Sequence, residues 1–488
     1  MKTANPARQS LGAYNNRDFL RLLLCAPFYW MLAFLVVEAA LAAASTALII
    51  KAGQDVAQEE FLISDFIWIV VAQSASYAVG ATSWVFAERA GFGAFGRYMM
   101  RFARTNRSQA SLLADRDRRE QVEPFLTNET FHIIFELIYE LEADLKLFFG
   151  LIFNMVVLGV AIDAGLPAVY GAVFVVLLAL QWSVRRPVAG AYLNQQRTTN
   201  RMTAHTYTAW DNIFSGNRYN FRLWHSGFKQ RLRDALGATI RAILAREGLA
   251  AISGILALAV VFTYLAIIAA RDVTNTTLLV ALAATLPRQI ELSSNMHGLA
   301  SGWNDLLAVW TRISGVCHAM QPRPDSGFDG RVEFDGLQLS RGEQQLPCTS
   351  VDEALRLIAA RPSGRILVRG RNGAGKSTLL AALKVRLGAE AFYWPTTDRL
   401  SFAFLRSAMD KAEDAADGGA PMLPPGFSSG ERQLRSLQEI ERQTHATVYL
   451  LDEWDANLDA RNRAQAEALV QSIAARAVVV EISHRDRV

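Results

Sequence analysis

Long apolar segments alternate with basic segments over the first 300 residues. Six apolar segments are present, at 22–50, 61–86, 145–162, 166–184, 249–270 and 278–300. A helix crosses the hydrocarbon core of a bilayer with about 20 apolar residues, so the first, second, fifth and sixth segments are each long enough to span alone. The third and fourth are shorter and are separated near Leu166-Pro167, and a buried helical pair is the alternative there.

The first apolar segment contains one acid, Glu38. A charged residue at the centre of a span costs about 2.5–3.5 kcal/mol. Thirteen Leu, Ile, Val and Phe residues of the same segment favour insertion by about 4–8 kcal/mol on that scale. The segment therefore remains a predicted span.

The cations are concentrated in two connections, 87–119 and 185–246. The alternate connections hold only Lys51 and Arg271 over 51–60, 163–165 and 271–277. Basic loops stay on the cytoplasmic side, so the pattern predicts six crossings with both termini cytoplasmic and an integral protein of the bacterial cytoplasmic membrane. A nucleic-acid surface would not explain this alternation, and the net charge is only +4, so no nucleic-acid partner is expected.

The basic connections are predicted to be helical rather than irregular. Glu136, Glu140 and Asp144 fall on one helix face, which indicates that the spans continue beyond the bilayer. A turn is predicted at Gly216-Asn217, beside a short amphipathic element at the inner tip.

The segment PRPDSGFDG at 322–330 interrupts the helical pattern. It predicts a boundary between a membrane domain, residues 1–321, and a second domain, residues 322–488.

Residues 370–378 read GRNGAGKST, between a β-type run at 365–368 and the helical pattern LLAALKVRL. This order of strand, glycine loop and helix is the context of a phosphate-binding loop. Backbone N–H groups would face phosphate oxygens, Lys376 would reach the terminal phosphates, and the Ser377 hydroxyl would ligate Mg²⁺. The expected nucleotide-binding residues are Gly370, Asn372, Gly373, Ala374, Gly375, Lys376, Ser377 and Thr378.

Two acids follow the apolar run of TVYLLDE at 447–453. At the end of a strand, Asp452 would hold Mg²⁺ and Glu453 would polarise an attacking water. A strand ending in solvated acids is the simpler alternative, and the phosphate loop upstream favours the catalytic interpretation.

FSSGERQ at 427–433 precedes a helical pattern. Ser428, Ser429 and Gly430 at a helix start form an anion site from free N–H groups, or an ordinary helix cap. Near the end of the chain, His484 follows the strand-like VVVEIS, where it would sense a γ-phosphate.

In this order and behind six apolar segments, the four motifs resemble those of ATP-binding-cassette transporters, with a likeness that covers essentially the whole chain. The resemblance implies an exporter-type half-transporter: an α-helical membrane domain of six transmembrane helices fused to an α/β P-loop NTPase domain of reduced size. In that family, 370–378 corresponds to the Walker A loop, 427–433 to the signature, and Asp452 with Glu453 to the Walker B pair. Asp459 corresponds to the aspartate of the segment after Walker B, and His484 to the switch histidine.

The resemblance further implies the cofactors ATP and Mg²⁺ and a homodimer in which each phosphate loop faces the signature of the other copy. The segments near 111–124 and 211–224 would be coupling helices that contact the ATPase domains. The expected function is ATP-driven transport by alternating access, with export of a peptide or an amphipathic molecule. The alternatives are an importer of this architecture and a regulatory or receptor-like membrane protein that binds ATP without transport.

The chain departs from the family pattern at four places. Only 52 residues separate Lys376 from Ser428, and 414–426 stands where part of a helical subdomain is expected. Thr396 takes the place of the usual glutamine, and no aromatic residue for stacking on adenine is evident, with Phe334 no more than a candidate.

Three charged residues lie in or near the predicted spans and are candidates for a role in transport: Glu38, Arg288 and Glu291. Arg288 and Glu291 are three residues apart, so a plain ion pair within one helix is an equal alternative.

Overall fold

The computed structural model describes residues 16–60, 62–107, 110, 122, 126, 129–319, 329–396, 400–406, 427–456 and 458–483. The chain divides into two compact units, with the main division between residues 320 and 321. Of the predicted boundary segment 322–330, only Asp329 and Gly330 are described.

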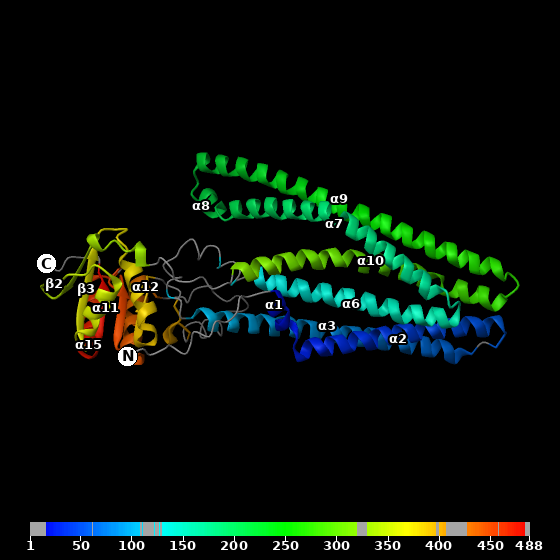
Figure 1. The fold of residues 1–488 in the computed structure, drawn as a ribbon, viewed down its shortest axis with the longest axis horizontal. Helices are drawn as coiled ribbons and strands as arrows, with labels where there is room; N and C mark the ends of the chain where they lie inside the picture. Colours follow the sequence, from blue (N-terminus) through cyan, green and yellow to red (C-terminus); the bar gives the residue numbers. More distant parts are fainter. Residues whose placement is uncertain are drawn as a thin grey trace. The chain divides into compact units, whose positions relative to one another are not determined.

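Helices that lie side by side, most of them long, make up the first unit (Figure 1). They are α1 (Asn16–Leu23), α2 (Ala26–Ala57), α3 (Ile63–Asn106), α6 (Glu129–Ala161), α7 (Leu166–Thr206), α8 (Ala209–Phe214), α9 (Arg218–Arg271) and α10 (Thr276–Ala319). The 44 residues of α3 and the 54 of α9 correspond to about 66 and 81 Å at 1.5 Å per residue. A bilayer core of about 30 Å is much shorter, which agrees with the prediction that the apolar segments continue as helices beyond it.

The tip between α7 and α9 follows the sequence prediction. The six-residue helix α8 is followed by Gly216 at φ +70°, and α9 begins two residues later. The left-handed backbone at Gly216 reverses the chain at the predicted turn. The other predicted tip, 111–124, lies outside the described residues apart from Val122.

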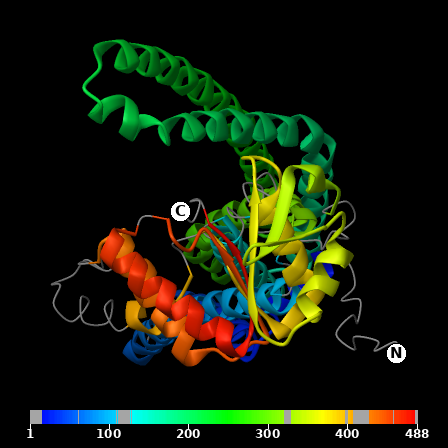
Figure 2. The same cartoon turned by 90° about the vertical axis from the view of Figure 1, so that its left-hand side faces the viewer.

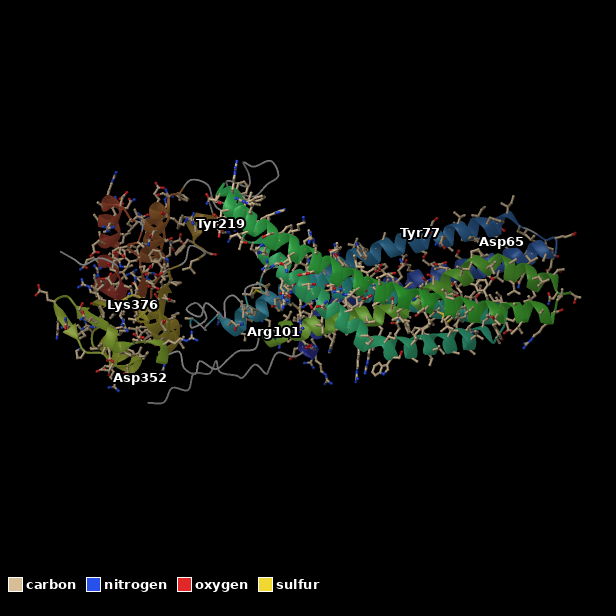
Figure 3. All side chains as sticks on the ribbon, turned by 90° about the horizontal axis from the view of Figure 1, so that it is seen from above. Asp65, Tyr77, Arg101, Tyr219, Asp352 and Lys376 are labelled. Atoms are coloured by element: carbon tan, nitrogen blue, oxygen red, sulfur yellow. The ribbon has the colours of Figure 1, made fainter. Side chains whose placement is uncertain are left out.

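Five helices of the described chain are long and apolar enough to cross a membrane: α2, α3, α6, α7 and α9. Their outer faces carry large apolar side chains, such as Trp68 at 60% and Val70 at 62% exposure in α3. Tyr77 on the same helix, labelled in Figure 3, is 70% exposed. A water-facing surface this rich in apolar groups is unusual, so the helical unit is compatible with a membrane protein.

The sixth predicted span is not among these helices. Its residues, 278–300, form the first part of α10, which is helical over its whole length. Pro287, Arg288, Gln289 and Glu291 interrupt the apolar run, and α10 is not among the described helices that are long and apolar enough to cross a membrane. The prediction of six spans is therefore wrong, because an apolar run was judged by its length without weighing the polar cluster near its middle.

The second unit contains a six-stranded mixed sheet in the order β2-β1-β3-β6-β5-β4. The strands are β1 (Leu337–Arg341), β2 (Gln344–Leu346), β3 (Gly364–Gly370), β4 (Ala391–Trp394), β5 (Val448–Asp452) and β6 (Val478–Ile482). Strands β3, β6, β5 and β4 are parallel, whereas β1 pairs antiparallel with both β2 and β3. Short 3₁₀ turns occur at η1 (Asp329–Arg331), η2 (Phe334–Gly336) and η3 (Gly388–Glu390).

Helices cover both faces of this sheet (Figure 2). They are α11 (Val351–Ala359), α12 (Lys376–Leu387), α14 (Ser429–Gln443) and α15 (Ala460–Arg476). Because side chains alternate along a strand, β5 contributes Val448 and Leu450 to the core beneath α11 and α12, and Tyr449 and Leu451 to the core beneath α14 and α15. Strand β5 is buried on both faces, as the continuous apolar run in the sequence indicated.

The predicted fold class, six exporter-type spans fused to an α/β P-loop NTPase domain, is thus corrected in both halves. The structure has five candidate spans and a small mixed sheet rather than a large α/β domain. The described part of the chain between β4 and α14 contains no further strand, so β4 is the last parallel strand and forms one edge of the sheet. The antiparallel pair β1 and β2 forms the opposite edge.

The exposed apolar face of α3 yields a prediction. Val70→Arg places a charge in that face, which opposes membrane insertion by about 2.5–3.5 kcal/mol at the centre of a span, so the chain recovered from washed membranes should decrease. The measurement is the amount that resists alkaline carbonate extraction, with Val70→Leu as the control. Equal recovery of both variants would show that this face does not contact lipid.

Candidate functional site

The loop between β3 and α12 contains two glycines in a conformation that other residues rarely adopt. Gly373 and Gly375 both have φ +87°. A Cβ on Gly375 would lie 2.8 Å from the carbonyl oxygen of Arg331, whereas one on Gly373 would have no neighbour within 4 Å. Glycine is thus required at 373 by backbone strain alone and at 375 by strain together with a close approach of two backbones.

Helix α12 begins directly after this loop, at Lys376. The first N–H groups of an α-helix lack carbonyl partners within it, so those of Lys376, Ser377 and Thr378 are oriented to bind an anion. The Lys376 ammonium, labelled in Figure 3, donates to the carbonyl of Gly370 at 2.9 Å and to that of Arg371 at 3.3 Å. The lysine is therefore held against the backbone of the loop, and its contact with terminal phosphates stays a prediction.

Not every predicted residue of the loop presents its side chain to a ligand. Ala374 is fully buried in the core beneath α11 and α12, and its carbonyl accepts from the N–H of Glu333 at 3.1 Å. Asn372 is exposed, and Gly370 is the last residue of β3. Ala374 therefore anchors the loop to the core rather than binding through its side chain.

Strand β6 brings the loop and the two predicted acids to the same edge of the sheet. Ile482 is the register partner of Val368 in β3 and of Asp452 in β5. The loop after β3 and the segment after β5 consequently emerge at the carboxyl ends of parallel strands that flank one common strand. This edge is where open α/β sheets bind their ligands.

The Ser377 hydroxyl and the Asp452 carboxylate lie close enough to share a metal ion. Ser377 Oγ donates to Asp452 Oδ1 at 3.1 Å, and Asp452 is 5% exposed. Oxygen ligands about 2.1 Å from an octahedral Mg²⁺ are separated by about 3 Å along an edge of the octahedron. The hydroxyl and carboxylate thus fit the magnesium site that the sequence predicted.

Tyr393 on β4 adds to the electrostatics of this edge. Burial, together with the nearby charge of Asp452, raises the pKa of the Tyr393 phenol above its ordinary value. The phenol therefore stays protonated at neutral pH and adds no charge near Asp452.

Glu453 follows Asp452 in a strained backbone conformation. Its φ is +52°, a value that non-glycine residues rarely adopt. Its N–H donates to the carbonyl of Ile482 at 3.1 Å, which ties it to the end of β6. His484, the predicted phosphate sensor two residues beyond Ile482, lies outside the described residues.

The predicted signature residues form the start of α14. Ser428 is the N-cap: its Oγ accepts from the N–H of Glu431 at 3.2 Å, and the Glu431 carboxylate accepts from the N–H of Ser428 at 3.0 Å. This capping box is the simpler interpretation that the sequence allowed. Ser429 is exposed beside it and Gly430 is buried; their role as an anion site for another copy stays a prediction.

Two further predicted positions have clear structural contacts. Asp459 is the N-cap of α15 and accepts from the N–H of Asn462 at 2.7 Å. The Thr396 hydroxyl lies 3.5 Å from the carbonyl of Asp452, so the segment after β4 does run beside the end of β5. Phe334, the candidate for stacking on adenine, is half-buried against the core of the sheet.

Sequence reasoning missed a buried charged cluster beneath this edge. Glu481 in β6 is 2% exposed, accepts from Arg365 Nη2 at 2.6 Å, and accepts from Trp454 Nε1 at 2.9 Å. Arg365 also pairs with Glu467 of α15. The signal was available, because Glu481 interrupts the apolar run VVVEI and Arg365 begins the strand beside it.

Gln433 of α14 lies at the end of the predicted motif 427–433, but the sequence assigned its side chain no role. Its Nε2 donates to the carbonyl of Glu453 at 3.1 Å and to that of Trp454 at 2.8 Å. Pattern alone gives no signal for this contact, since a half-buried glutamine on a helix is ordinary.

The charged candidates of the helical unit are paired. Glu38 of α2 forms an ion pair with Lys146 of α6 at 2.7 Å. Arg288 pairs with Glu291 at 2.6 Å, which confirms the plain ion pair as one of the two interpretations given above. The same guanidinium reaches Thr46 at 3.1 Å and Asn154 at 3.2 Å.

Comparison with known proteins adds no family assignment: no family model matches this chain, and no curated protein matches it. The arrangement of residues at the edge of the sheet is therefore the feature of this chain that indicates a function.

The two left-handed glycines provide a matched pair of substitutions. Gly373→Ala should lower the free energy of unfolding by about 1–3 kcal/mol through backbone strain. Gly375→Ala should cost more, because its Cβ also meets the Arg331 carbonyl oxygen. Chemical denaturation of both variants in detergent measures the difference, and equal losses would contradict the close approach at residue 375.

Proposed function

We propose that this chain binds ATP with Mg²⁺ at the loop 370–378 and hydrolyses it to drive transport of a substrate across a membrane. The observation that supports this most is the meeting of Lys376, Ser377, Asp452 and Glu453 at one edge of the sheet. The five long apolar helices on the same chain support the membrane part of the proposal.

The residues of the loop would bind the phosphates in three ways. N–H groups at the start of α12 donate to phosphate oxygens, and Lys376 exchanges its carbonyl partners for the terminal phosphates. Ser377 and Asp452 would hold Mg²⁺, which neutralises charge on the β- and γ-phosphates when bound. Because Asp452 is already buried beside Ser377, little reorganisation is needed.

Glu453 would act as the general base. Its carboxylate accepts a proton from water as the water oxygen attacks the γ-phosphorus, and the bond from that phosphorus to the bridging oxygen breaks. ADP leaves with the electron pair of that bond. The fixed backbone of Glu453, held by Ile482 and Gln433, is the feature of the chain that would orient the carboxylate.

Transport would require a second copy of the chain. In the homodimer that the motif order favours, Ser428, Ser429 and Gly430 of one copy complete the phosphate site of the other. We place the chain in the bacterial cytoplasmic membrane with the basic connections 87–119 and 185–246 on the cytoplasmic side. The cargo we favour is a peptide or amphipathic molecule moved outward, and import is the alternative direction.

A regulatory protein that binds ATP without turnover is the second candidate. Thr396 stands where a glutamine is expected, and its hydroxyl lies 3.5 Å from the backbone carbonyl of Asp452. A shorter side chain there favours weaker coupling between the nucleotide and the rest of the protein.

Glu453→Gln tests hydrolysis. This change keeps the shape of the side chain but removes the base, so kcat for ATP hydrolysis should fall about 100- to 10,000-fold while ATP binding is retained. Phosphate release and equilibrium binding of labelled ATP measure the two effects, with Glu390→Gln at the opposite edge of the sheet as the control. Undiminished phosphate release in Glu453→Gln would rule out the role of Glu453.

Lys376→Ala tests the link between nucleotide and transport. Loss of the ammonium removes charged hydrogen bonds to phosphate, so affinity for ATP should fall about 10- to 100-fold. ATP-dependent accumulation of labelled peptides in sealed vesicles should fall with it. Arg386→Ala, at the other end of α12, is the control and should change neither.

The wild-type protein separates the two candidate functions. ATP turnover with peptide accumulation supports the transporter, whereas ATP binding with neither supports the regulatory protein.

A further inference from the structure

Glu453 occupies a backbone conformation that its neighbours must maintain. Its φ of +52° lies in a region where a side chain crowds its own backbone, and such conformations persist only where surrounding contacts hold them. The orientation of the Glu453 carboxylate therefore depends on whatever fixes the peptide groups on either side of this residue.

Gln433 contacts the peptide group that follows Glu453 and also the next one along the chain. Its side-chain amide carries two N–H donors, and Nε2 lies 3.1 Å from the carbonyl oxygen of Glu453 and 2.8 Å from that of Trp454. The Glu453 carbonyl also accepts from the N–H of Ala456 at 3.1 Å, which closes a turn. The amide thus bridges two successive carbonyls at the point where the chain leaves β5.

The other side of the same segment is anchored independently. The Trp454 ring is 3% exposed, and its Nε1 donates to buried Glu481. The N–H of Glu453 donates to the carbonyl of Ile482. With β6 holding one side, Gln433 supplies the contact from α14.

Helix α14 holds Gln433 in a definite register. Leu434 and Leu437 are buried in the core that α14 shares with α15 and the sheet, and Ser428 begins the helix with a capping box. Gln433 lies five residues after that cap. A shift of the start of α14 is consequently transmitted along about one turn of helix to the carbonyls of Glu453 and Trp454.

We propose that Gln433 is a positioning residue that links the Ser428–Gly430 end of α14 to the carboxylate of Glu453. Capture of phosphate at the start of α14 would move the helix, and Gln433 would carry that movement to the base. The inference rests on the proposed function, because it assigns Glu453 the role of base.

The experiment compares Gln433→Met, which keeps the length of the side chain but removes both donors, with Gln443→Met near the far end of the same helix. We expect kcat for ATP hydrolysis by the full-length protein to fall about tenfold in Gln433→Met, equivalent to about 1.4 kcal/mol. The KM for ATP should stay within about twofold, since no loop residue is altered. Gln443→Met should match the wild type.

A second measurement separates positioning from general loss of structure. Hydrogen exchange of the segment 448–456 should be faster in Gln433→Met, while that of 391–394 in β4 should not change.

In the Glu453→Gln background, Gln433→Met should leave the residual single-turnover rate unchanged, because there is no longer a base to orient. Gln433→Glu replaces the donor by a charged acceptor. It should lower kcat further, because a carboxylate would repel the carbonyls of Glu453 and Trp454 that the amide of Gln433 holds.

The outcomes distinguish this inference from the proposal on which it rests. A wild-type protein without ATP turnover contradicts the proposed function itself. Wild-type turnover with an unchanged kcat in Gln433→Met, or an equal further loss in the Glu453→Gln background, overturns only the role of Gln433. A Gln433→Met protein whose two segments both exchange faster would indicate a structural role instead.

Discussion

The parallel pairing of β6 between β3 and β5 is the constraint on which the candidate site depends. The loop 370–378 and the acids Asp452 and Glu453 are separated by more than 70 residues along the chain, and neither could bind phosphate and metal together without this pairing. Ile482 pairs with Val368 on one side and Asp452 on the other. A shift of either register by one residue would turn every side chain of that strand to the opposite face and separate Ser377 from Asp452.

The buried cluster of Arg365, Glu481 and Trp454 reinforces that register. A carboxylate inside a sheet is tolerated only when it is paired and hydrogen-bonded, and Glu481 is satisfied by a guanidinium from β3 and an indole N–H from the segment after β5. Burial lowers the pKa of Arg365, but its hydrogen bonds and charge interactions with Glu481 and Glu467 outweigh that effect and leave the pKa raised. The pair therefore stays charged, and a slipped strand would leave both groups buried without partners.

The parts of the site that could be predicted are those encoded in short stretches. The strand before Gly370, the helix from Lys376 and the strand ending at Asp452 follow from local periodicity and glycine placement, and the structure has each of them. Gln433 and Glu481 act across strands and helices, so their partners depend on a register that no short stretch reveals. Ala374 was assigned to the ligand through the loop backbone, and the burial of its methyl group in the core depends on the packing of α11 and α12, which the motif does not reveal. The prediction of a sixth span was wrong for another reason. The segment 278–300 was counted as a span because of its length, although the polar residues around Arg288 interrupt its apolar sequence.

The polar cluster of α10 also limits what can face its outer side. Arg288 is held from within the unit by Thr46, Asn154 and the carbonyl of Ala42, and its remaining partner is Glu291, which is half exposed. A carboxylate in hydrocarbon is costly even when paired, whereas the exposed Val70 and Trp68 of α3 favour hydrocarbon over water. These two surfaces of one helical unit therefore require different environments. The exposed face of α3 is suited to contact with acyl chains, whereas the face of α10 that carries Glu291 has to contact water or protein.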